Sequence, residues 1–244
     1  MKRLRSSSRT AATLAPNLEN RIHSYTAAAA AAGVGLLALT QPSQAKVIYT
    51  PAHQTITKNS TFSLDLNADG VSDFAVSNLS ADISFIRNTN GSPYTFALLR
   101  LYPGLRSNRV WGAGRFASAL SRGVTVDSKG NFNNSAAAIM GEVSSNQLVV
   151  GRTYRGQWAP PGGSVTNKYV GLKFHIDGQV HYGWARFNVK IRPAETTGSQ
   201  ATLTGYAYET VPNKPIITGK TTGPDVETMP PVALGRLALG ALRH

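Results

Sequence analysis

The sequence contains no cysteine among its 244 residues. This absence excludes a disulfide framework, a thiolate metal site and a cysteine nucleophile. A folded domain of this chain therefore draws its stability from its hydrophobic core and from any metal that it binds.

Charged residues are also scarce, and acids are the scarcer kind. They make up 15% of the chain, against roughly 25% in an average globular protein. The chain has 25 Lys and Arg but only 12 Asp and Glu. The basic side chains are scattered, and the densest set (Arg100, Arg106, Arg109, Arg115 and Arg122) is not interleaved with aromatic residues. This pattern predicts a solvated basic surface without a specific nucleic-acid site, and such a surface can attract carbohydrate or an anionic envelope polymer.

No apolar run is long enough to cross a membrane. Five basic residues (Lys2, Arg3, Arg5, Arg9 and Arg21) precede a 13-residue apolar run at 27–39, whereas a span needs roughly 20 residues. Ser43 and Ala45 supply the small residues that signal peptidase reads. Residues 1–45 are therefore predicted to be a signal peptide for Sec export, cleaved after Ala45. The mature chain would be secreted or held in the cell envelope, with a net charge of +9 and no transmembrane span.

Long amphipathic helices and repeats at a fixed period are missing as well. Short β-favouring runs occur at 46–49, 61–66, 74–76, 96–102 and 201–209, with turn residues between them. Residues 103–168 are rich in Gly, Ser, Asn and Arg, and 135–140 is the one stretch that favours a short helical turn. The sequence predicts an all-β fold, an antiparallel sandwich or jelly roll, over 46–212. Residues 213–244 read as a Pro/Gly/Thr-rich tail with a short apolar end.

The clearest local structure is a hairpin over 169–189. Asp177-Gly178 favours a type I′ turn, because both central residues of that turn need positive φ. The resulting register pairs Ile176 with Gln179, Phe174 with His181, Leu172 with Gly183, and Val170 with Ala185. It also places His175 and His181 on opposite faces, so the two histidines do not form a metal pair.

The other face of this hairpin allows two interpretations. Tyr169, Tyr182 and Trp184 offer apolar rings, and Lys173 and Arg186 offer hydrogen-bond donors, a combination suited to a carbohydrate platform. Alternatively the face is a second buried layer, in which Trp184 fills the space opposite Gly171.

The most specific chemistry lies in DLNADGVSD, residues 65–73. Calcium binds six to eight oxygens, and a loop with ligands at positions 1, 3, 5, 7 and 9 and glycine at position 6 turns its oxygens inward. The predicted ligands are Asp65, Asn67, Asp69, the Val71 carbonyl and Asp73, with Gly70 at the bend. Position 12 is Val76, so further oxygens have to come from elsewhere, such as Asp82 or water. The alternative is that these residues are simply good turn formers. We expect a structural Ca²⁺ loop between two strands.

Signatures of catalysis are lacking. The sequence has no GxSxG elbow, HExxH motif or phosphate-binding glycine loop. A glycosidase needs two placed carboxylates, and Glu142 with Asp127 is the pair that stays open. We predict a non-enzymatic binding or surface role and assign no catalytic residue; a carbohydrate-binding module and a secreted hydrolase with unplaced carboxylates are the alternatives.

Two resemblances accompany these patterns. The DxNxDGxxDF spelling resembles the calcium loops of FG-GAP-type β-propeller blades, but it occurs once and does not imply a propeller. The blocks KVIYTPAHQTI, YVGLKFHIDGQVHYGWARFNV and TGYAYETVPNKPIITGK resemble a family of uncharacterised secreted bacterial proteins, many of which carry PEP-CTERM sorting tails. This resemblance implies an exported β-domain. The tail departs from the sorting pattern, because Met229-Pro230-Pro231 replaces Pro-Glu-Pro and Arg236 interrupts the apolar run.

Overall fold

The computed structural model describes residues 45–83, 94–146, 151–192 and 198–230. The predicted signal peptide, apart from Ala45, and the apolar end of the tail lie outside these ranges. All regular secondary structure in the described residues is β, which confirms the all-β prediction. Within these ranges the structure contains no helix with the length and apolar character of a membrane span.

The described residues form fifteen strands, several of them very short. They are β1 (Val47–Ile56), β2 (Ser60–Leu64), β3 (Phe74–Ile83), β4 (Tyr94–Pro103), β5 (Arg109–Ala113), β6 (Phe116–Ala117), β7 (Thr125–Val126), β8 (Phe132–Asn133), β9 (Ala138–Asn146), β10 (Gly151–Arg155), β11 (Ser164–Ile176), β12 (Gln179–Lys190), β13 (Gln200–Glu209), β14 (Ile216–Ile217) and β15 (Val226–Thr228).

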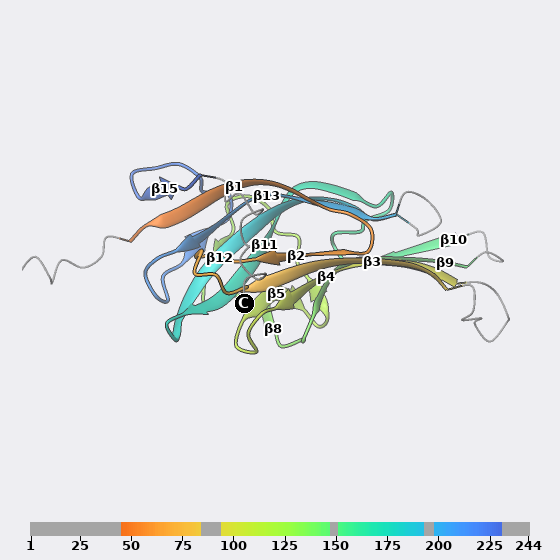
Figure 1. Cartoon of the computed structure of the whole chain (residues 1–244), viewed down its shortest axis with the longest axis horizontal. Helices are drawn as coiled ribbons and strands as arrows, with labels where there is room; N and C mark the ends of the chain where they lie inside the picture. The colour runs from red at the N-terminus through yellow and green to blue at the C-terminus, as the bar shows by residue number, and fades with distance from the viewer. Residues whose placement is uncertain (1–44, 84–93, 147–150, 193–197, 231–244) are drawn as a thin grey trace, which may run out of the picture. The chain divides into compact units, whose positions relative to one another are not determined.

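Thirteen of these strands belong to one continuous curled sheet. Its order is β15-β1-β13-β12-β11-β5-β6-β9-β4-β3-β2, with β10 beside β9 and β8 beside β5 (Figure 1). Most neighbours are antiparallel, whereas β1–β15 and β6–β9 are parallel. The remaining strands, β7 and β14, form a separate pair. The sheet is therefore mixed, and the finer sandwich or jelly-roll arrangement stays a prediction.

The main core lies between the two halves of the curled sheet. Phe74 and Leu99 from the β2–β3–β4 half are fully buried with Leu172, Phe174 and Phe187 from the β11–β12 half. Alternate residues of each strand enter this cluster, as expected for strands with one buried face. A sheet that curls in this way buries its own inner surface without a covering helix.

The central hairpin agrees with the predicted register. β11 and β12 pair Phe174 with His181 and Gly171 with Trp184. Asp177 and Gly178 have φ angles of 50° and 77°, as a type I′ turn requires. The buried His181 ring lies 6.0 Å from Phe174, and its Nδ1 is 2.8 Å from the Glu209 carbonyl oxygen, whereas His175 faces the other way.

Two expectations need correction. The short helical turn that 135–140 could have formed is not present, because Ala138 opens β9, and pairing with β4 overrides the helix preference of a short alanine run. Residues 213–228, assigned above to the tail, contribute β14 and β15, and β15 extends the sheet beside β1. The folded β-structure therefore continues past residue 212 to Thr228.

Candidate metal centre

The predicted calcium loop connects β2 to β3. Leu64 and Phe74 are paired across the two strands and both are buried, so the loop leaves the sheet and returns at one place. The amide of Asp73 closes it by donating to the Leu64 carbonyl at 3.0 Å. A rigid hairpin therefore fixes both ends of residues 65–73.

Asp65 organises the bend. Its two carboxylate oxygens accept hydrogen bonds from the amides of Ala68, at 2.7 Å, and Gly70, at 2.8 Å. Ala68 and Gly70 both have positive φ, 60° and 88°, which curls the backbone around this carboxylate. Gly70 thus stands where the sharp bend requires glycine.

Asp69 and Asn67 hold the tip of the loop. The Asp69 carboxylate accepts from the Val71 amide at 2.7 Å and from the Asn67 side-chain amide at 2.8 Å. Asn67 Oδ1 is buried and has no hydrogen-bond partner among the described residues. Val71 exposes 55% of its surface, so any contribution to a site comes from its backbone carbonyl.

Asp73 is the deepest acid of the loop, with 5% of its surface exposed. Burial raises the pKa of its carboxyl from 3.8 to about 6, and the negative charges of Asp65 and Asp69 add to this rise. A hydrogen bond from the Leu66 amide, 2.8 Å from Oδ2, partly opposes it by lowering the pKa. The calcium-free loop therefore carries an unfavourable buried charge at neutral pH.

This raised pKa predicts a pH dependence for the calcium-free protein. Between about pH 4 and pH 6 folded Asp73 keeps a proton that the unfolded chain has released, so the free energy of unfolding falls as pH rises. Asp73→Asn retains an acceptor for the Leu66 amide and loses the titration. Urea unfolding in calcium-free buffer is expected to show a wild-type-minus-variant difference that declines across this window and is flat above about pH 7. A constant difference would contradict the raised pKa.

The carboxylates are not gathered around one point. Over the described ranges, no three His, Asp or Glu side chains form a group that could hold a metal ion. Carboxylate oxygens have two lone pairs each, so an oxygen that accepts from an amide can still coordinate a cation. Calcium binding thus requires Asp65, Asp69 and Asp73 to turn toward a common centre.

The backbone of Asp82 lies far from the loop along β3. It pairs with Thr95 near the far end of β3, whereas the loop joins the near end. Nine residues of extended chain place residues 73 and 82 about 30 Å apart. Burial raises the pKa of the Tyr206 and Tyr208 phenols, and the negative charge of Asp65 adds to the rise of both.

A second loop, residues 103–108, holds the Asp73 end of the calcium loop by hydrogen bonds. The sequence did not reveal this contact. The Asp73 carbonyl accepts from the Gly104 amide at 2.7 Å and from the buried Asn108 side-chain amide at 3.0 Å. A Cβ at Gly104 would lie 1.9 Å from the Ser72 carbonyl oxygen. Asn108 Oδ1 is in turn 3.4 Å from His175 Nδ1, which connects the loop to β11. The Pro103-Gly104 pair, which favours a turn, was the feature of the sequence that could have pointed to this second loop.

The hairpin face that suggested a carbohydrate platform is covered. Trp184 is fully buried, and Tyr182 and Tyr169 expose 2% and 4% of their surfaces. They form a second apolar cluster with Val126 of β7 and Ile216 of β14. The structure therefore corrects the platform interpretation, since these rings present no open surface to a sugar.

The two donors on that face also have partners. Lys173 Nζ lies 5.6 Å from the centroid of the Phe132 ring. Arg186 donates to the Thr204 hydroxyl at 2.8 Å and to the Thr204 carbonyl at 2.9 Å. The buried-layer alternative holds with one change: Trp111 fills the space at Gly171, where a Cβ would lie 3.1 Å from its side chain.

The open pair of acids, Glu142 and Asp127, has structural partners. Glu142 accepts from Arg155 at 3.1 Å and from Arg115 at 3.4 Å. Asp127 accepts from the Lys129 amide at 2.9 Å within a turn. Their contacts provide no support for a pair of hydrolytic carboxylates.

Comparison of the chain with protein-family models, with curated proteins and with solved structures finds no match.

Proposed function

We propose that this protein is an exported β-domain of the bacterial envelope or exterior, stabilised by calcium in the 65–73 loop, with a non-enzymatic binding role. The observation that carries the calcium assignment is the polar crowding of one short loop. Asp73 is buried beside two other carboxylates, and the buried Oδ1 of Asn67 has no partner among the described residues.

A divalent cation would relieve this arrangement. It would neutralise the repulsion among Asp65, Asp69 and Asp73 and give Asn67 Oδ1 a partner. Calcium suits the set because the oxygens come from carboxylates, an amide and a carbonyl on a loop that can adjust. Tyr208 or water would complete the coordination.

Calcium is expected to stabilise the folded protein measurably. At ten to a hundred times the dissociation constant it should add about 1–3 kcal/mol, which raises the melting temperature by roughly 3–10 °C for a domain of this size. The measurement is thermal unfolding of the purified protein in calcium and in chelator, with magnesium as a second cation.

A matched pair of variants locates the effect. Asp69→Asn keeps an acceptor for the Val71 amide and removes one charge, so most of the calcium-dependent shift should be lost. Asp177→Asn removes the same charge at the exposed hairpin turn, where asparagine also accepts positive φ, and should retain the shift. Equal melting temperatures of the wild type in calcium and chelator would overturn the assignment.

The binding role follows from the basic surface and from the lack of catalytic signatures. The mature chain would carry 20 basic and 11 acidic side chains, which favours carbohydrate carrying negative charge or another anionic envelope polymer as partner. Export is tested separately by N-terminal sequencing of protein recovered from the envelope and medium, where Lys46 is expected as the first residue.

A further inference from the structure

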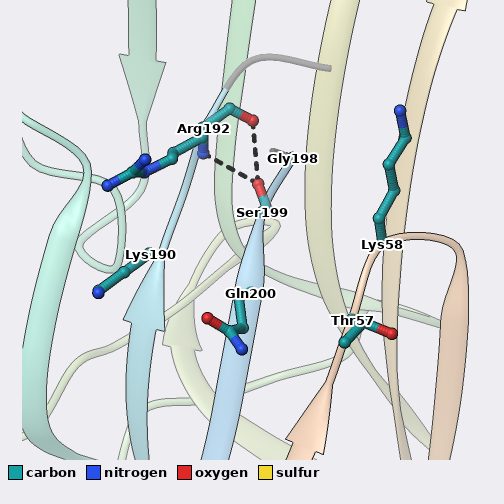
Figure 2. A pocket seen from close by; sticks show the side chains of 7 residues that line it. All are labelled: Thr57, Lys58, Lys190, Arg192, Gly198, Ser199 and Gln200. Atoms are coloured by element: carbon teal, nitrogen blue, oxygen red, sulfur yellow. Dashed lines mark hydrogen bonds between the residues drawn. The ribbon is translucent and has the colours of Figure 1, made fainter. Parts of the chain in front are cut away.

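A pocket of about 360 Å³ opens beside the turn between β1 and β2 and the adjoining ends of β12 and β13. Figure 2 shows its lining residues, and the side chains of Lys190 and Arg192 lie on one side of Ser199 while Lys58 lies on the other. The remaining lining residues are Thr57, Gly198 and Gln200. Among the described lining residues none is acidic, and three (Lys58, Lys190 and Arg192) are cationic.

The strand pattern brings two of these cations together. At the end of β12, buried Val189 and Ile191 alternate with exposed Lys190 and Arg192. Residues two apart on an extended strand point the same way, about 7 Å apart. Neither Lys190 nor Arg192 has an acidic partner among the ion pairs of the described residues.

The floor of the pocket is held by buried hydrogen bonds. The fully buried Asn78 donates to the Ser199 carbonyl at 2.6 Å and to the Ile56 carbonyl at 3.3 Å, linking β3 to the end of β1 and to the residue before β13. The Ser199 hydroxyl accepts from the Arg192 amide at 3.1 Å and donates to the Arg192 carbonyl at 3.2 Å, as Figure 2 shows. These contacts fix the backbone that carries Arg192.

Gly198 shapes the wall nearest Lys58. It has a φ of 73°, and a Cβ at this position would lie 3.1 Å from Lys58 Cδ. The aliphatic stem of Lys58 therefore packs on Gly198. The pocket is thus formed by fixed backbone segments, with charged ends of side chains at its rim.

We infer that this pocket binds an oxyanion group: a carboxylate, sulfate or phosphate carried by an anionic ligand. The Arg192 guanidinium supplies a planar set of donors, Lys190 supplies a compact charge, and the Gln200 amide and Thr57 hydroxyl add neutral donors. The pocket lies beyond the start of β2 at Ser60, and the calcium loop follows its end at Leu64, so the two sites stand at opposite ends of this strand. Oxyanion binding in this pocket does not depend on the proposed binding role. Only the assignment of an anionic polymer as the ligand rests on that role.

Isothermal titration calorimetry of the full protein in calcium-free buffer at low salt tests this site. The probes are inorganic phosphate, inorganic sulfate and trigalacturonate, with neutral maltotriose as the uncharged comparison. The double variant Lys190→Gln/Arg192→Gln is expected to weaken anion binding about tenfold. Each exposed charge contact contributes modestly to the binding free energy, and the variant removes two of them. The control Lys129→Gln/Arg152→Gln removes the same charge from exposed positions outside the pocket and should stay within about twofold of wild type.

The outcomes separate the ligand sources. Trigalacturonate binding that the pocket variant loses assigns the site to acidic saccharides, and phosphate or sulfate binding that it loses assigns the site to free oxyanions. Absence of binding by all three anions at 10 mM, or equal binding by both double variants, overturns the inference. Since calcium is omitted, failure here leaves the calcium melting result standing, and the reverse also holds.

Discussion

Trp184→Ala is expected to lower the free energy of unfolding by about 3–5 kcal/mol, the usual cost of truncating a large buried aromatic side chain. Trp184 is fully buried, and its ring packs edge-on against Tyr169 at 5.2 Å and beside Tyr49 at 5.9 Å. Its removal opens a cavity that β7 and β14 cannot fill without shifting. Urea unfolding monitored by far-UV circular dichroism measures the loss.

Ile217→Ala is the comparison for this variant, because Ile217 lies in β14 next to the same cluster yet is 44% exposed. It should cost less than about 1 kcal/mol. A Trp184→Ala protein with near-wild-type stability and with lost glycan binding would restore the carbohydrate platform and contradict the buried layer.

Gly104→Ala is expected to cost about 3 kcal/mol or more, the upper range for overpacking, because the clash is with backbone. The added Cβ would lie 1.9 Å from the Ser72 carbonyl oxygen and 3.0 Å from the Asp73 carbonyl carbon. Either the 103–108 loop or the end of the calcium loop has to move, which breaks the hydrogen bond between Gly104 N and Asp73 O. Urea unfolding in chelator measures the stability, and calcium titration of the same variant measures the effect on the metal site.

Leu105→Ala is the neighbouring control. Its side chain is 45% exposed, so its truncation should change stability by no more than about 0.5 kcal/mol. If Gly104→Ala matched this control, the 103–108 loop would not be seated against Ser72 and Asp73 as described.

Local signals predicted the parts of the fold that depend on nearby residues. Asp177-Gly178 fixes the register of β11 and β12 because a two-residue turn leaves one pairing for every residue that follows. The bend at 65–73 could also be predicted from local residues, since the Asp65 carboxylate accepts from the amides of Ala68 and Gly70, both within five residues. Such features need no knowledge of the rest of the chain.

Features assembled from distant segments were not predictable in this way. The cover over Trp184 comes from β7 and β14, two strands of two residues each that are separated by about 90 positions. Two-residue strands carry no periodicity, so the sequence could not decide between an open and a buried aromatic face. The cationic pocket has the same origin, because Lys58 and Arg192 come from distant segments that line one pocket only in the folded sheet.

The position of β1 has a consequence for how the chain folds. Its antiparallel partner is β13, so Val47 pairs with Glu209, and the Lys46 amide donates to the Thr210 hydroxyl. The first strand of the sheet therefore cannot pair with β13 until nearly the whole domain has been synthesised. Pairing between strands so far apart in sequence gives a high contact order, which favours slow folding. This delay leaves β1 without its β13 partner while the chain is still being synthesised. Refolding of the purified protein should accordingly be slow, on the millisecond-to-second scale typical of β-proteins with non-local pairing.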